Sequence, residues 1–136
     1  MKVLRREVTV LAILASAFLA GCASTGPTAD DDNNPDRLTR EQIMEVGATN
    51  LYDVVNRLRP RWLLVSSVRS FSMENEIVVL QNDMLLGNTD ALKQMTPELA
   101  FGMQYLDGAR AAASLPGLMS GRHIEGAIIV STRPGG

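Results

Sequence analysis

The sequence predicts a small α+β domain over residues 38–133, in which short helices pack on a mixed sheet of about four strands. Three observations indicate this class. Residues 51–58 carry apolar side chains at i, i+3, i+4 and i+7, the spacing of a helix with one buried face. Residues 77–80 form a short β-branched run, and residues 126–132 have a similar composition. Helical and strand patterns therefore occur in one short chain.

The first helices are predicted from their capping signals. Thr39 and Gln42 have the spacing of a capping box, and Gly47 ends the short helix that they begin. Asn50 caps a second helix, which Pro60 ends because the residue before a proline is pushed out of helical geometry. The buried stripe of this second helix is Leu51, Val54, Val55 and Leu58.

The rest of the domain is predicted to contain short strands and short helical pieces. Composition predicts strands at 62–65, 77–80, 84–86, 103–106 and 126–132, with a turn at 81–83 and loops at 66–76 and 116–123. Helical pieces are expected at three places: after Thr89 or Asp90, from Thr96–Pro97–Glu98, and in the alanine-rich residues 107–115. We find no internal repeat.

The N-terminus has the pattern of a secretion signal over residues 1–21. Three basic residues precede Val8–Leu19, which is almost wholly apolar and shorter than the roughly 20 residues of a membrane-spanning helix. Small residues then lead to Cys22. Together these features resemble the lipobox of bacterial lipoproteins, which implies cleavage between Gly21 and Cys22 and acylation of Cys22. The alternative is an ordinary cleaved signal with an unused cysteine.

The lipoprotein resemblance also implies a location. Two or more acyl chains anchor a protein stably, so a lipidated Cys22 holds the chain on a membrane. In proteobacterial lipoproteins an Asp directly after the acylated cysteine favours the inner membrane. The residue here is Ala23, and we therefore expect a lipid-anchored protein of the cell envelope at the outer membrane.

Residues 22–37 are predicted to be a flexible acidic linker that carries the lipid, and residues 134–136 a disordered tail. The linker contains small residues, prolines and aspartates but no large apolar side chain before its end, so burial cannot offset the entropy of ordering it. Its acidic run lacks the later Gly and Glu of an EF-hand calcium loop.

Charge argues against a nucleic-acid partner. Removing residues 1–21 takes three basic and one acidic residue from the 13 and 15 of the full chain, which leaves 10 and 14 and a net charge of −4. Such a chain lacks the positive charge that binds phosphates. Cys22 is the only cysteine, so no disulfide and no cysteine metal cluster forms once it is acylated.

The sequence does not indicate an enzyme, a cofactor or a metal. Its only histidine, His123, lies in a glycine-flanked loop, and no G-x-S-x-G elbow supplies a nucleophile for it. A structural or exposed loop histidine is favoured over a catalytic one. One histidine also leaves a metal site to carboxylates alone, and these have no motif spacing.

The candidate interaction surface is Arg57, Arg59, Arg61 and Trp62. The three arginines lie at a predicted helix C-terminus, where cations suit the negative end of the helix dipole. That is a sufficient structural reason for them. The functional alternative is contact with anionic lipid head groups or an acidic partner. Trp62 is more often a packing residue than a stacking platform.

The order of motifs over residues 38–133 resembles the plug domain of TonB-dependent outer-membrane receptors. The matching segments are Ile43, Leu51–Val55, Pro60, Ile77–Leu80, Thr96–Leu99, Tyr105–Gly108 and Gly126–Thr132. Two segments depart from the pattern: Asn82–Asp83–Met84 replaces an Asp-Gly turn, and Leu115–Pro116–Gly117 replaces a Tyr-Gly. No barrel sequence follows before Gly136, so we expect a plug-like domain without its β-barrel.

Two functions follow from this pattern. The first is a non-enzymatic, lipid-anchored protein of the cell envelope, whose plug-like domain is a protein-interaction or transport-accessory module with an envelope or outer-membrane protein as partner. The alternative is a periplasmic-face lipoprotein that binds a small ligand and feeds a transporter. Resemblance to a plug implies a fold and does not by itself imply uptake of a ligand.

Overall fold

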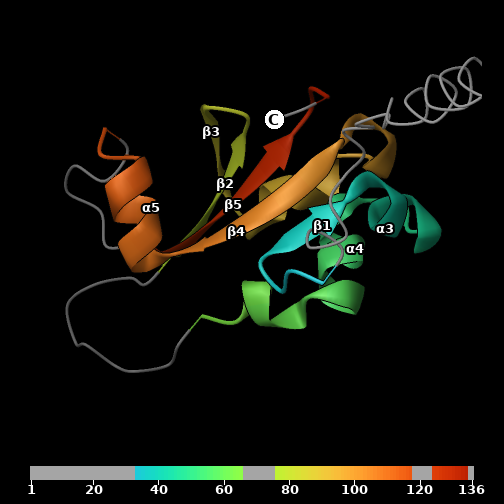
Figure 1. Ribbon diagram of the computed structural model, residues 1–136, viewed down its shortest axis with the longest axis horizontal. Coiled ribbons are helices and arrows are strands. Elements are labelled where there is room, and N and C mark those ends of the chain that lie inside the picture. Colours follow the sequence, from blue (N-terminus) through green and yellow to red (C-terminus); the bar gives the residue numbers. More distant parts are fainter. Residues whose placement is uncertain (1–32, 66–75, 118–123, 135–136) are drawn as a thin grey trace, which may run out of the picture.

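The computed structural model describes residues 33–65, 76–117 and 124–134. They form a five-stranded sheet with short helices, which confirms the predicted α+β class with one strand more than expected (Figure 1). The elements are β1 (Arg37–Thr39), α3 (Arg40–Glu45), α4 (Leu51–Leu58), the 3₁₀ helix η1 (Pro60–Leu63), β2 (Glu76–Gln81), β3 (Met84–Asn88), the 3₁₀ helices η2 (Thr89–Gln94) and η3 (Pro97–Leu99), β4 (Gly102–Asp107), α5 (Gly108–Ser114) and β5 (Ile124–Ser131).

The sheet is mixed, with the strand order β1–β4–β5–β2–β3. β5 and β2 pair in parallel, and the other three pairs are antiparallel. The parallel pair lies inside the sheet, and residues 77–80 of β2 are all buried. A strand that is covered on both faces has a continuous apolar run instead of an alternating one, which explains the composition that predicted this strand.

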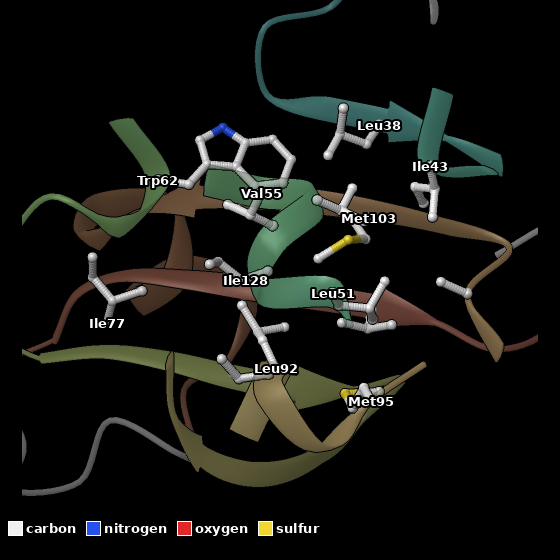
Figure 2. Close-up of a cluster of buried hydrophobic side chains, with 14 residues drawn as sticks. Leu38, Ile43, Leu51, Val55, Trp62, Ile77, Leu92, Met95, Met103 and Ile128 are labelled. Carbon is white, nitrogen blue, oxygen red and sulfur yellow. The ribbon is translucent and has the colours of Figure 1, made fainter. Parts of the chain in front are cut away.

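The larger core lies on the face of the sheet that α3, α4, η1 and η2 cover. Its buried residues are Leu38, Ile43, Leu51, Val54, Val55, Trp62, Ile77, Val79, Leu92, Met95, Ala100, Met103, Ile128 and Val130. Figure 2 shows these side chains converging from the helices and the sheet. Each fully buried aliphatic side chain contributes about 1.5–3 kcal/mol relative to an exposed one, so this face dominates the stability of the domain.

A smaller core lies on the other face, where α5 packs against β4 and β5 (Figure 1). It consists of Val78, Leu80, Leu106, Ala111, Ile124 and Ala127. Side chains alternate between the two faces of a strand. Val78 and Leu80 therefore enter this core, while Ile77 and Val79 enter the larger one.

The predicted caps of the first helices are confirmed. The Thr39 side chain accepts a hydrogen bond from the Gln42 amide, and the Gln42 side chain accepts one from the Thr39 amide, which completes the capping box. The Asn50 side chain accepts one from the Asp53 amide at the start of α4. Gly47 has a φ of +60° between the two helices, a conformation that glycine adopts without strain.

The predicted strand at residues 62–65 is wrong. Residues 60–63 form η1, with Pro60 at its first position and Trp62 fully buried against the larger core. Proline fixes a φ that suits the first turn of a helix, and this local effect outweighs the β propensity of the apolar residues after it. Leu64 and Val65, which follow η1, belong to no strand and are exposed.

Smaller differences concern the ends of elements. β1 was not predicted, because three residues are too few to show an alternating pattern. The cap of η2 is Asn88, which precedes both of the expected caps, Thr89 and Asp90. Thr96 precedes η3 without a side-chain capping bond. Residues 66–75 of the predicted loop lie outside the described part of the chain.

Candidate functional site

The predicted basic cluster holds a segment of its own chain. Residues 34–37, which come directly before and at the start of β1, lie against η1 and β4. We call residues 34–37 and the side chains that bind them the N-terminal junction. The Asp36 carbonyl accepts a hydrogen bond of 2.8 Å from the Tyr105 amide, and the Arg37 amide donates one to the Asn34 carbonyl. The described domain thus begins before the predicted boundary at Leu38.

Trp62 lies inside the junction rather than on the surface. Its indole is fully buried, and its Nε1 donates a hydrogen bond of 3.2 Å to the Pro35 carbonyl. Its ring stacks on that of Tyr105, with the centroids 5.8 Å apart. Burial raises the pKa of Tyr105, and the nearby Glu125 carboxylate adds to the increase. Trp62 therefore contributes packing and one hydrogen bond, and it offers no exposed platform to a partner.

The three arginines of the predicted surface differ in their contacts. Arg59 donates hydrogen bonds to the carbonyls of Leu58 and Arg37, and Arg61 donates one of 2.7 Å to the Pro35 carbonyl. Arg57 donates to the Val46 carbonyl on the loop after α3. Arg59 and Arg61 thus bind the junction segment, while Arg57 ties α4 to the loop before it.

Four charged side chains form ion pairs at the junction. Asp36 accepts hydrogen bonds from Arg61 through Oδ1 and from Arg110 through Oδ2, the latter at 2.8 Å. Arg110 also pairs with Asp107 at 2.7 Å. The Arg110 amide and side chain lower the pKa of Asp107, and the bonds to Asp36 and Asp107 raise the pKa of Arg110. Asp36 therefore links η1 to α5.

The junction is built to hold a chain segment. Its side-chain donors are guanidinium and indole N–H groups, and an arginine stays protonated in proteins, so it cannot act as a general base. The side chains of Arg61 and Arg110 are 54% and 53% exposed, against 21% for Asp36. Exposed ion pairs contribute little to stability, so these pairs fix a geometry more than they stabilise the fold.

The other predicted sites lie outside the described ranges. Gly21, Cys22 and His123 belong to residues that the structure does not describe, so their predicted roles stay predictions. Within the described ranges, no group of three His, Cys, Asp or Glu side chains is placed to hold a metal ion. In those same ranges we find no helix with the length and apolarity needed to cross a bilayer.

The role of Asp36 in the junction was not predicted from the sequence. Asp36 lies 25 residues from Arg61 and 74 from Arg110 along the chain. No local spacing links residues so far apart, and Asp36 stands among several other acidic residues at the end of the predicted linker.

Comparisons with protein families, with curated proteins and with solved structures found no match to this chain. The resemblance to a TonB-dependent receptor plug therefore stays a prediction from the order of its motifs.

Proposed function

We propose that this chain is a lipid-anchored protein of the cell envelope, whose domain acts as a non-enzymatic interaction module at the outer membrane. The observation that carries the proposal is the N-terminal junction. It fixes residues 34–37, the last four residues of the predicted linker, to the body of the domain. A lipid on Cys22 would then be connected to the domain at a defined point.

The anchor side of the proposal rests on the order of features in the sequence. A basic cap, an apolar core and small residues precede Cys22, as in a lipoprotein signal. Residues 22–33, in any conformation, span at most roughly 40 Å. The domain and whatever it binds would therefore stay close to the membrane surface.

We also propose that the domain is plug-like. Supporting this, three of the matching motifs fall on the neighbouring strands β2, β4 and β5. They are Ile77–Leu80 in β2, Tyr105–Gly108 at the end of β4 and the start of α5, and Gly126–Thr132, of which Gly126–Ser131 lies in β5. The proposal concerns the fold and a protein-binding role. It does not extend to uptake of a ligand.

Changing Cys22 to Ser tests the anchor. The lipid would be lost, and we expect the protein to move from the membrane fraction to the soluble fraction while its circular dichroism keeps the α+β signal. Ser24→Ala, two residues away, is the matched control and should stay in the membrane fraction. Mass spectrometry of the mature N-terminus should find an acylated Cys22. A Cys22→Ser protein that stays membrane-bound would refute the anchor.

A further inference from the structure

Three exposed apolar residues lie on the two segments that Arg40 joins, α3 and residues 97–101, at the opposite end of β1 from the N-terminal junction. Arg40 donates hydrogen bonds to the Glu98 and Ala100 carbonyls at 3.3 and 2.9 Å, and its guanidinium lies 4.4 Å from the centre of the Phe101 ring. Leu99 lies between those two carbonyls in the chain, and Met44 is one helical turn from Arg40 on α3. We call Arg40, Met44, Leu99 and Phe101 the Arg40 patch.

The three apolar members of the Arg40 patch are all exposed. Met44 is 43% exposed, Leu99 54% and Phe101 40%. Single exposed apolar residues are normal on a protein surface, whereas a group of them indicates a binding site. Methionine, aromatic residues and arginine are also the types that are enriched at protein interfaces.

Arg40 and Phe101 are ordered before any partner binds. The two hydrogen bonds of Arg40 to backbone carbonyls and its position over the Phe101 ring fix both side chains. Side chains that are already ordered lose less entropy when a partner binds. Arginine and aromatic residues also carry much of the binding energy where interfaces have been scanned.

The charges around the patch indicate the kind of partner. α3 and the segment 97–101 carry three exposed glutamates, Glu41, Glu45 and Glu98. The cations beside them are Arg40 and Arg57, which reaches the Val46 carbonyl after α3, so negative charge is still in excess. An anionic bilayer would be repelled by this rim. A second copy of the chain would oppose its own glutamates to those of the first, because a two-fold interface brings the same patch together.

We propose that the Arg40 patch docks a protein partner through a segment with apolar side chains flanked by Lys or Arg. The apolar side chains would cover Met44, Leu99 and Phe101 at the centre, and the basic residues would face the glutamates at the rim. This inference rests on the proposed interaction function and adds the surface and the chemistry of its partner.

Photo-crosslinking in cells tests the proposal on the full, processed chain. A benzophenone amino acid replaces Leu99 in one strain and Met84 in another. Met84 is 67% exposed on β3, outside the patch, and is the matched position. We expect the probe at position 99 to capture one protein, at a site that mass spectrometry maps to an apolar segment flanked by Lys or Arg. The probe at position 84 should not capture that segment.

Second-site changes show whether the patch itself binds. Met44→Asp should lower the yield from position 99 about tenfold, because it places a charge at the centre of the contact, while Met84→Asp should leave the yield unchanged. Glu98→Lys should also lower the yield, and Lys→Glu in the captured segment should restore it. Circular dichroism of the purified variants checks that each one folds.

Other results would overturn the docking proposal. The stated partner would be excluded if the probe captured lipid alone, a second copy of the chain, or an acidic segment. It would also be excluded if Met44→Asp left the crosslinking yield at position 99 unchanged. If position 84 captures a protein and position 99 does not, the interaction function stands and the Arg40 patch is not its surface. If neither position, nor a further set of exposed positions, captures any protein, the interaction function itself fails.

Discussion

Tyr105 lies between two residues that make its position possible. On one side its ring stacks on the buried Trp62. On the other side it covers Gly126 of the neighbouring strand, where an added Cβ would lie 2.5 Å from the Tyr105 hydroxyl and 2.8 Å from two ring carbons. An aromatic side chain that covers a glycine on the adjacent strand shields backbone that the glycine leaves open. The stacked pair of Trp62 and Tyr105 therefore depends on having a glycine at position 126 of β5.

Gly126→Ala should destabilise the domain by about 1–3 kcal/mol, because the new methyl group displaces the Tyr105 ring from a packed site. Urea unfolding of the purified mature chain measures the free energy of unfolding. Gly117→Ala is the control, since nothing lies within 4 Å of a Cβ added there. We expect its effect to stay within about 0.5 kcal/mol. Equal effects at the two positions would contradict this account of Tyr105.

Asp107 caps α5 and should make stability depend on pH. Its folded pKa lies below the ordinary value of 3.8, first because of the hydrogen bond from the Arg110 amide. A carboxylate with a lowered pKa stabilises the fold above pH 3.8, and this contribution is lost as the pH falls through the folded pKa. Asp107→Asn keeps an oxygen that can accept the Arg110 amide hydrogen bond but removes the charge.

The free energies of unfolding of the natural chain and of Asp107→Asn should therefore differ at neutral pH and converge below about pH 3.8. Denaturant unfolding at a series of pH values measures both. Asp83→Asn, at an exposed position in the turn between β2 and β3, is the control. A difference that stays constant from pH 7 to pH 2 would show that the charge of Asp107 does not stabilise the fold.

At the scale of elements, the sequence was most informative where the determinants are local. The capping box at Thr39 and the cap at Asn50 each involve residues three apart, so their spacing predicted the starts of α3 and α4. The strand predicted at residues 62–65 was wrong because the apolar residues there have β propensity. Pro60 and the burial of Trp62 against the larger core instead favour the 3₁₀ helix η1. Local patterns therefore predicted elements but not every conformation.

The junction and the pairing of strands depend on residues far apart in the chain. The arginines of the junction were recognisable as a cluster, but the segment they bind, residues 34–37, was not. The parallel pairing of β2 with β5 joins residues about fifty positions apart, such as Val79 and Ile128. Only packing in three dimensions selects such partners, and a single sequence carries no spacing that shows it.

The Asn50 cap provides the test at this scale. Asn50→Ala removes the acceptor of the 2.9 Å hydrogen bond from the Asp53 amide, and we expect it to lower the free energy of unfolding by about 1 kcal/mol. Asn56→Ala, at an exposed position within α4, is the matched control and should change stability by less than about 0.5 kcal/mol. Thermal and urea unfolding should agree. An Asn50→Ala chain as stable as the Asn56→Ala chain would show that α4 does not need its cap.

At the scale of the whole molecule, the strand β1 connects the two surfaces that matter for the proposed function. The N-terminal junction ends at Arg37, where β1 begins, and the Arg40 patch begins directly after β1 ends at Thr39. Figure 1 shows β1 at the edge of the sheet, beside β4. The proposed attachment point and the proposed docking surface are therefore separated by a strand of three residues, which would hold a bound partner close to the anchored end of the domain.

The junction should open locally without unfolding the domain. Asp36→Asn removes the charge that pairs with Arg61 and Arg110. Exposed ion pairs contribute little to stability, so the global free energy of unfolding should fall little. The Tyr105 amide, which donates to the Asp36 carbonyl, should nevertheless exchange its hydrogen faster, because segments open locally below the global free energy. Hydrogen exchange followed by NMR measures this rate.

Asp90→Asn is the matched control for that experiment, since it removes an exposed ion pair of 2.6 Å with Lys93 in η2, away from the junction. It should leave the Tyr105 exchange rate unchanged. If Asp36→Asn also leaves that rate unchanged, the hydrogen bonds that Trp62 and Arg61 donate to the Pro35 carbonyl hold the segment without the charges. If instead Tyr105 exchanges only with global unfolding in every variant, residues 34–37 are an inseparable part of the fold.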